Sequence, residues 1–251
     1  MGVSLNYMNH KDLRICILAA GKGSRMNSEL PKVLHKINDK PILHFVLETS
    51  ETLRPKEIIL IVGFRKDMVI ESVDNFNVSF AYQEEQKGTA HAIMQCKEHL
   101  INKPGHTLVL SGDVPFISNN TLKNLIEIHN KNESLGSILS ANIEDPSGYG
   151  RIVRNDNKFV KIVEHKDANE NELKINEINS GIYLFDNKTL MDKINLIKDS
   201  NKQNEFYLTD IFEFIDKNKI SVYNTKQTDE INGINTIKQL NELSKKNEIY
   251  K

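Results

Sequence analysis

The stretch of the sequence that most clearly indicates chemistry is AAGKGSRM, residues 19–26, followed by the pair Pro31-Lys32. Gly21 and Gly23 let backbone N–H groups approach an anion with no side chain in the way. Arg25 offers a bidentate fork to phosphate oxygens, and Lys32 adds a compact second cation. These residues predict a phosphate-binding loop in which Arg25 and Lys32 are catalytic and meet the pyrophosphate that leaves a nucleoside triphosphate.

Three kinds of phosphate-binding loop compete for this stretch. A P-loop needs a Lys-Ser or Lys-Thr pair directly after a glycine, and the order here is different. A dinucleotide-binding loop needs a third glycine where Met26 stands, which disfavours a nicotinamide oxidoreductase. The nucleotidyltransferase pattern A-A-G-x-G-[ST]-R-M with a later Pro-Lys pair fits throughout.

Polar residues elsewhere suit the other parts of such a site. Asp113 follows an apolar run, where a carboxylate suits Mg²⁺, and Asn235 in NGIN is a candidate second metal ligand. The amide of Gln83 can pair with a base edge, Gly88 permits close backbone approach, and Thr89 begins a helical pattern as its expected N-cap. Taken singly, each of these residues is also typical of a turn or a helix cap.

A third set of residues suits a hydroxyl-rich ligand such as a sugar. Gly150, Glu164 and Asn179 stand at the beginnings or ends of expected strands and offer a backbone N–H, a carboxylate and an amide. Each alone is also an ordinary turn residue. We find no H-E-x-x-H, C-x-x-C or G-x-S-x-G motif, and the 8 histidines have no ligand spacing.

Composition narrows the class of protein. The net charge of −1 over 251 residues gives no basic field for nucleic acid. No apolar run approaches the ~18 residues of a membrane span, so no membrane insertion is expected. The 2 cysteines, Cys16 and Cys96, are expected to be reduced core residues of a cytoplasmic protein. Residues 1–12 lack a signal-peptide pattern and are expected to form a flexible extension.

The elements that position these residues follow from hydrophobic patterning. Apolar runs at 14–19, 57–62 and 107–113 predict strands buried on both faces, and they alternate with helical patterns at 40–51, after Thr89 and after Ser118. This alternation predicts an α/β fold with a mostly parallel mixed sheet flanked by helices.

The pattern changes after residue 136, where several strands follow one another with short connections and predict a β-rich extension of the same sheet. Helices are expected at 187–197, 205–216 and 236–248. We therefore expect a single domain over 13–251. Its parts are a nucleotide-binding half (about 13–135), a sugar-binding half (136–235) and a C-terminal helix (236–251).

The motifs, taken in order, closely resemble one family over about residues 13–240. The segments are LAAGKGSRMNSELPKVL, QKGTAHA, SGDVPFI, GYGRIV, VEHKDA, INSGIYLF, NEFYLTDI and NGIN. They resemble the uridylyltransferase domain of the bacterial bifunctional N-acetylglucosamine-1-phosphate uridylyltransferase/glucosamine-1-phosphate acetyltransferases. The resemblance implies a Rossmann-like nucleotide-diphospho-sugar transferase fold. It also implies the cytoplasmic reaction of UTP with N-acetylglucosamine 1-phosphate to give UDP-N-acetylglucosamine, a cell-envelope precursor, and pyrophosphate.

The resemblance also assigns residues to roles. Those implied to bind the nucleotide are Leu18, Ala19, Ala20, Gly21, Gly23, Gln83, Gly88 and Thr89. Those implied to bind the sugar are Gly150, Glu164 and Asn179. Asp113 and Asn235 are implied to hold Mg²⁺, with Arg25 and Lys32 on the phosphates.

The sequence departs from the family pattern in two respects. Ser111 stands where the pattern has an aromatic residue, which is expected to loosen sugar or ribose contacts. After Gly181 only Gly233 follows and no hexapeptide repeat occurs, so the family's left-handed β-helix acetyltransferase half is not expected. Because the family's trimer is built largely through that half, the oligomeric state stays open.

Two alternative functions remain beside the implied one. The first is a nucleotidyltransferase that uses another nucleoside triphosphate or another sugar 1-phosphate. The second is a non-catalytic module that only binds a sugar nucleotide. Because both expected metal ligands and both cations are present, the residues favour catalysis over binding alone.

Overall fold

The apolar runs of the first half form the centre of a twisted sheet. The structure is a computed structural model and describes residues 12–249. Within them, nine strands form one sheet whose main path runs β11-β7-β10-β6-β1-β4-β5. The strands of this path are β11 (Ile220–Thr225), β7 (Gly136–Asn142), β10 (Glu177–Asp186), β6 (His106–Ser111), β1 (Leu13–Leu18), β4 (Glu57–Val62) and β5 (Ser79–Tyr82). Strands β6, β1, β4 and β5 are mutually parallel, as predicted.

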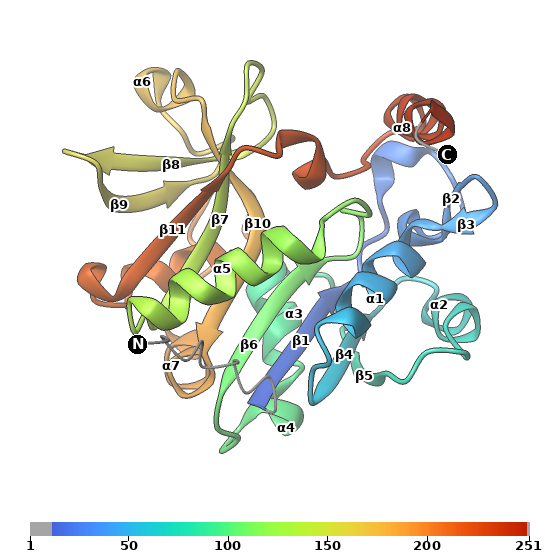
Figure 1. Cartoon of the computed structure of the whole chain (residues 1–251), viewed down its shortest axis with the longest axis horizontal. Helices are drawn as coiled ribbons and strands as arrows, with labels where there is room; N and C mark the ends of the chain where they lie inside the picture. Colours follow the sequence, from blue (N-terminus) through green and yellow to red (C-terminus); the bar gives the residue numbers. More distant parts are fainter. Residues whose placement is uncertain (1–11, 250–251) are drawn as a thin grey trace, which may run out of the picture.

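The second half continues this sheet, as expected, with antiparallel strands. Strand β10 runs antiparallel to both β6 and β7, and its pairing with β7 is irregular between Asn179 and Tyr183. Strands β8 (Gly150–Asn155) and β9 (Lys158–Val163) form an arm attached to β10. Figure 1 shows this arm extending away from the parallel strands. Strand β11, parallel to β7, was not predicted from the sequence.

Helices cover both faces of the parallel strands, which confirms the predicted fold class. Figure 1 shows α1 (Ile42–Thr52) and α5 (Asn119–Lys131) in front of the sheet and α3 (Thr89–Met94) behind it. Helix α8 (Ile237–Ile249) lies against the short strand β2 (Lys36–Ile37). The remaining elements are β3 (Lys40–Pro41), α2 (Lys66–Ser72), α4 (Lys97–Leu100), α6 (Glu170–Leu173), α7 (Asn187–Lys193) and the 3₁₀ turns.

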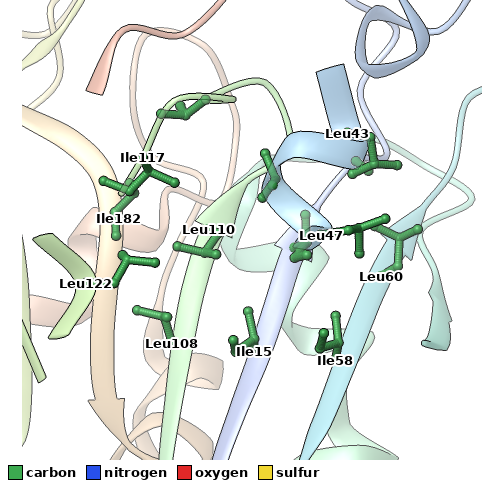
Figure 2. Close-up of a cluster of buried hydrophobic side chains, with 14 of the residues drawn as sticks. Ile15, Leu43, Leu47, Ile58, Leu60, Leu108, Leu110, Ile117, Leu122 and Ile182 are labelled. Carbon is green, nitrogen blue, oxygen red and sulfur yellow. The ribbon is translucent and has the colours of Figure 1, made fainter. Parts of the chain in front are cut away.

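The core lies between the sheet and these helices. Figure 2 shows Ile15, Leu60 and Leu108, from three adjacent strands, on the same face of the sheet as Leu43 and Leu47 of α1. All five side chains are fully buried. The intervening strand residues point to the opposite face and pack there with α3. Burial on both faces explains why these strands are continuous apolar runs instead of alternating ones.

Several predicted boundaries were wrong. The apolar stripe after Thr89 predicted one helix, but it is divided into α3 and α4, and Thr89 is the first helical residue while Gly88 is the cap. The helix expected at 205–216 is only the 3₁₀ turn Leu208–Glu213. Its preceding backbone is engaged elsewhere, since Phe206 bonds through its N–H to Lys87 O and through its carbonyl to Ala90 N.

Other sequence expectations agree with the structure. Ser118 caps α5 by accepting from the backbone N–H of Thr121. Cys16 and Cys96 are buried and free. The helix expected at 187–197 is α7 followed by the 3₁₀ turn Ile194–Leu196. No helix among residues 12–249 is long and apolar enough to cross a membrane. Of the expected extension 1–12, all but Asp12 lies outside the described residues.

Candidate active site

A cavity of about 290 Å³ opens where the parallel strands end. Leu18 pairs with Ser111 at the ends of β1 and β6, and Gln83 directly follows β5, so all three meet at one edge of the sheet. The cavity contains seven of the eight residues implied to bind the nucleotide: Leu18, Ala19, Ala20, Gly21, Gln83, Gly88 and Thr89. The eighth, Gly23, lines an adjoining cavity of about 640 Å³.

The two expected cations and the two expected metal ligands form one cluster. Lys32 makes an ion pair with Asp113, and its Nζ also donates to Asn235 Oδ1 at 3.1 Å. Arg25 Nη2 donates to the same Asn235 oxygen at 2.8 Å. The fold thus brings together residues that are up to 210 positions apart in the sequence.

Backbone contacts bring Asn235 to this cluster. The N–H of Ile234 donates to the carbonyl of Asp113 at 2.9 Å, and the N–H of Asn235 donates to Gln239 Oε1 at 2.8 Å. The Ile234 side chain is fully buried beside Met26, the residue that replaces the third glycine of a dinucleotide-binding loop. One small apolar cluster therefore holds both the phosphate loop and the segment that carries Asn235.

The donor atoms of this cluster fit a hard divalent cation. Asp113 Oδ2 and Asn235 Oδ1 both contact the Lys32 ammonium, so one cation can reach both oxygens. Mg²⁺ prefers oxygen ligands and usually completes its shell with waters and substrate phosphates. Within residues 12–249 no group of three or more His, Cys, Asp or Glu side chains could hold a metal alone. A metal bound by Asp113 and Asn235 would therefore take its remaining ligands from water or phosphate.

One acceptor and one donor lie at the end of the first cavity that Gln83 and Gly88 line. The side chain of Gln83 is 4% exposed, and its Nε2 donates to Gly88 O at 3.0 Å. Within residues 12–249 no donor reaches Gln83 Oε1, and the Gly88 N–H has no acceptor. Position 88 requires glycine, because its φ is +111° and a Cβ there would lie 2.5 Å from Phe206 O.

A second cavity, of about 190 Å³, contains all three residues implied to bind the sugar. Strand register explains why they meet: Asn179 pairs with Gly150 between β10 and β8, and Glu164 directly follows β9, which pairs with β8. Thr209 Oγ1 donates to Glu164 Oε1 at 3.1 Å. Burial raises the pKa of the Glu164 carboxyl above its usual value, and the hydrogen bond from Thr209 opposes this shift.

The cavities adjoin one another. The 290 Å³ and 190 Å³ cavities share Leu18, Thr89 and Ser111 as a wall, and the 640 Å³ cavity shares Lys32 with the first and Glu164 with the second. Ser111, which departs from the family pattern, stands at this shared wall. The charged cluster lines two of these cavities: Lys32 and Asp113 line the first, and Arg25, Lys32 and Asn235 line the 640 Å³ cavity.

Comparison with known proteins identifies the chain's family. The family described as Nucleotidyl transferase matches residues 15–243. The chain belongs to this family. The matched residues include the lining of all three cavities and the charged cluster, so these sites lie within one nucleotidyl transferase unit. The resemblance seen in the sequence is thereby confirmed.

Relatives and solved structures agree with this family. The chain is 47% identical to the Bifunctional protein GlmU of Bacillus cereus (strain G9842) over 223 residues, which are 87% of this chain and 48% of the relative. It is 42% identical to the Bifunctional protein GlmU of Clostridium botulinum (strain 657 / Type Ba4) over 229 residues, 90% of this chain and 50% of the relative. The chain spans about half the length of these curated relatives.

Two solved structures share the fold with this nucleotidyl transferase. One is a putative glucose-1-phosphate thymidylyltransferase from Bacillus anthracis in complex with a sucrose, with a TM-score of 0.73 and 21% identity over 92% of this chain and 95% of that one. The other is a UDP-glucose pyrophosphorylase complexed with UDP-glucose, with a TM-score of 0.73 and 20% identity over 95% and 99%. The fold expected from the sequence is confirmed.

Sequence reasoning missed several residues of the site. Thr209 was not singled out because nothing local to it indicates that it meets Glu164, and only the tertiary fold brings them together. Tyr149 lines the 190 Å³ cavity, and burial and nearby Asp113 raise the pKa of its hydroxyl. Its position between two glycines in SGYGRIV was the available signal. His91, one of the histidines without ligand spacing, contacts Gln83.

Proposed function

We propose that the chain transfers the uridylyl group of UTP to N-acetylglucosamine 1-phosphate and releases pyrophosphate. The observation that carries this proposal is the charged cluster in the 640 Å³ cavity, which adjoins both a cavity with base-pairing groups and a cavity with a partly buried carboxylate and an amide. Membership of the nucleotidyl transferase family supports the reaction type. The choice of an amino sugar as the substrate is supported by the resemblance of the sequence motifs.

The hydrogen-bonding groups of the first cavity favour uracil. The uracil edge presents the N3–H as a donor beside a carbonyl acceptor, which complements Gln83 Oε1 and the Gly88 N–H. Cytosine presents an acceptor at N3, so it would leave two acceptors facing one another. A site that pairs buried polar groups with one substrate discriminates strongly against a substrate that leaves them unpaired.

The second cavity suits the hydroxyl and acetamido groups of an amino sugar. Glu164 accepts from Thr209 through one oxygen, and its other oxygen would lie 3.3 Å from a Cβ added at Gly150. The Asn179 Oδ1 accepts from the N–H of Gly181 at 3.2 Å, and its Nδ2 donates to the hydroxyl of Tyr183 at 2.7 Å. These contacts hold the carboxylate and the amide in fixed orientations, which favours a ligand of fixed stereochemistry.

The chemistry follows from the charge of the reactants. The sugar phosphate is already an anion, so its oxygen attacks the α-phosphorus of UTP without a general base. The new P–O bond forms as the bond to the β-phosphate breaks, and pyrophosphate leaves with the electron pair. Arg25 and Lys32 stabilise the charge that develops on the pyrophosphate. Mg²⁺, when bound by Asp113 and Asn235, neutralises phosphate oxygens.

We place this reaction in the cytoplasm, where UTP is made. The buried, free thiols of Cys16 and Cys96 are compatible with that reducing compartment.

The test is pyrophosphate release measured with each of four nucleoside triphosphates and a panel of sugar 1-phosphates, with Mg²⁺ or with EDTA. The proposal expects the highest kcat/KM for UTP with N-acetylglucosamine 1-phosphate and loss of turnover in EDTA. A preference for CTP or for another sugar 1-phosphate overturns the assigned substrates. Binding of UDP-N-acetylglucosamine without any turnover overturns the enzymatic role.

A further inference from the structure

We propose that Gln239 is a positioning residue that fixes the backbone of Asn235 and thereby sets how tightly the chain binds a divalent cation. This inference rests on the proposed function in one respect, because it takes Asn235 as a ligand of that cation. Gln239 lines none of the three cavities described above, so it acts on the cation only through Asn235.

The donors around the side chain of Gln239 leave its orientation unambiguous. Oε1 accepts from the backbone N–H of Asn235 at 2.8 Å and from that of Thr236 at 3.0 Å, and the Thr236 hydroxyl lies 3.3 Å from the same oxygen. A backbone N–H can only donate, so the amide oxygen and not the amide nitrogen must face these two groups.

These bonds extend a capping box at the start of α8. Thr236 Oγ1 accepts from the backbone N–H of Gln239 at 3.2 Å, and Gln239 Oε1 accepts in return from the backbone N–H of Thr236. The motif needs only this reciprocal pair. The additional bond from the N–H of Asn235 therefore goes beyond what capping the helix requires.

The same oxygen restrains both backbone dihedrals of Asn235. The two N–H groups that it accepts from belong to the peptide units before and after the Asn235 α-carbon. Each peptide unit is planar, so holding both units holds φ and ψ of the residue between them. The direction of the Asn235 side chain is then fixed, and with it the place of Oδ1 beside Arg25 and Lys32.

Helix α8 is a firm base for this restraint. Leu240, directly after Gln239, packs in the same buried apolar cluster as Met26, which directly follows Arg25 in the phosphate loop. These packing contacts do not use the amide of Gln239. Loss of the amide oxygen should therefore leave α8 in place and release only the backbone of Asn235.

The orientation of Asn235 is important because the cation needs two ligands at once. Asp113 Oδ2 and Asn235 Oδ1 must both point to one ion, and Mg²⁺ demands near-ideal geometry. Groups that orient a metal ligand without touching the metal typically account for tenfold or more of its affinity. Gln239 has this relation to Asn235.

The experiment measures binding of Mn²⁺ to the full chain by electron paramagnetic resonance, with no substrate present. Gln239→Met keeps the length and helix propensity of the side chain but removes the oxygen, and Gln239→Glu keeps an oxygen that a capping box can use. We expect Gln239→Met to weaken Mn²⁺ binding about tenfold and Gln239→Glu to bind at least as tightly as the wild type. In turnover, Gln239→Met should need about tenfold more Mg²⁺ for half-maximal activity and keep kcat at saturating Mg²⁺ within about twofold.

The matched control is Thr236→Ala, which removes the other half of the capping box. This variant loses the acceptor of the Gln239 N–H but keeps the Gln239 oxygen and the Asn235 N–H. Both variants should lower Tm, because both weaken the cap of α8. Thr236→Ala should nevertheless keep Mn²⁺ affinity within about twofold of wild type. Equal weakening by the two variants would show that fraying of α8 controls the metal, and it overturns the inference.

A double-mutant cycle separates this inference from the proposed function. In an Asn235→Ala background, Gln239→Met should change Mn²⁺ affinity by less than about twofold, because the ligand that it positions is gone. Unchanged Mn²⁺ affinity in Gln239→Met alone, or a full effect in the Asn235→Ala background, overturns the inference and leaves the proposed function intact. Wild-type Mn²⁺ affinity in both Asn235→Ala and Asp113→Ala overturns the metal site of the proposed function, and the inference with it.

Discussion

The 290 Å³ cavity, which we propose binds the nucleotide, and the 190 Å³ cavity, which we propose binds the sugar, are built in different ways, and we call them the nucleotide cavity and the sugar cavity. The nucleotide cavity lies at the ends of parallel strands and is lined by short loops that follow them, with backbone groups and small residues predominating. The sugar cavity is assembled from an antiparallel arm, an irregular strand and the 3₁₀ turn that carries Thr209. It contains the partly buried carboxylate of Glu164. The first region depends on the charges of Lys32, Asp113 and the exposed Arg25 and on backbone geometry, whereas the second depends on tertiary packing.

The largest effect is expected from Arg25, which tests whether exposed charge dominates in the nucleotide region. Arg25→Ala should lower kcat/KM by about 100-fold or more, because a donor to the departing pyrophosphate is lost. The matched control is Arg54→Ala, which removes an exposed arginine just beyond α1. Steady-state pyrophosphate release measures both variants. Near-normal turnover of Arg25→Ala would remove this residue from the catalytic set.

Glu164 tests whether a partly buried charge in the sugar region binds the ligand at the expense of stability. Glu164→Gln should raise KM for the sugar 1-phosphate about 30-fold, because a charged acceptor is lost, and leave KM for UTP within about twofold. An equal rise in both KM values would contradict the separation of the two regions.

The same variant should be more stable than the wild type. Burial raises the pKa of Glu164 in the folded chain, so the folded state disfavours the ionised carboxylate. Its ionisation therefore costs stability above its ordinary pKa, and that cost disappears as pH falls through that value. Removing the charge should raise Tm by about 2 °C at neutral pH, where one kcal/mol corresponds to a few degrees for a chain of this size. Thermal melts at pH 7.5 and pH 4 test this, and an advantage that does not shrink at pH 4 would contradict it.

A substitution of Lys32 tests whether a divalent cation can take the place of its ammonium group in the charged cluster. Its ammonium binds the same two oxygens that fit a metal, so it competes with a divalent cation for Asp113 and Asn235. Lys32→Gln should bind Mn²⁺ alone about tenfold more tightly than the wild type, a difference equal to about 1.4 kcal/mol, while losing activity. Electron paramagnetic resonance titration with Mn²⁺ measures this without turnover. Equal or weaker Mn²⁺ binding would show that Lys32 does not compete for these ligands.

The difference between the two regions also explains what the sequence predicted. The nucleotide region could be found because its strands are continuous apolar runs and its loops carry a pattern with fixed spacing, from Gly21 to Lys32. Asp113 was placed correctly because strand ends meet at one edge. The contact between Arg25 and Asn235 was not predicted, since no local pattern joins residues 210 positions apart.

The sugar region was less predictable for a physical reason. Strand register brings Gly150, Glu164 and Asn179 together, and register depends on pairing between strands, not on the composition of one strand. The turn carrying Thr209 was mistaken for a helix because its apolar spacing looks helical. Its backbone instead bonds to residues 87–90, so tertiary contacts override local preference.

Thr209 gives the smallest effect and the finest test of the sugar region. Thr209→Val keeps the shape of the side chain but removes the hydroxyl that donates to Glu164. Glu164 then loses one of the contacts that fix its orientation, so KM for the sugar 1-phosphate should rise about fivefold, the cost of one hydrogen bond. In a Glu164→Gln background the same change should have less effect, because the two residues act as a pair. KM for UTP is the internal control, and a rise there would mean that the turn also shapes the nucleotide cavity, through the bond from Leu208 N–H to Thr89 Oγ1.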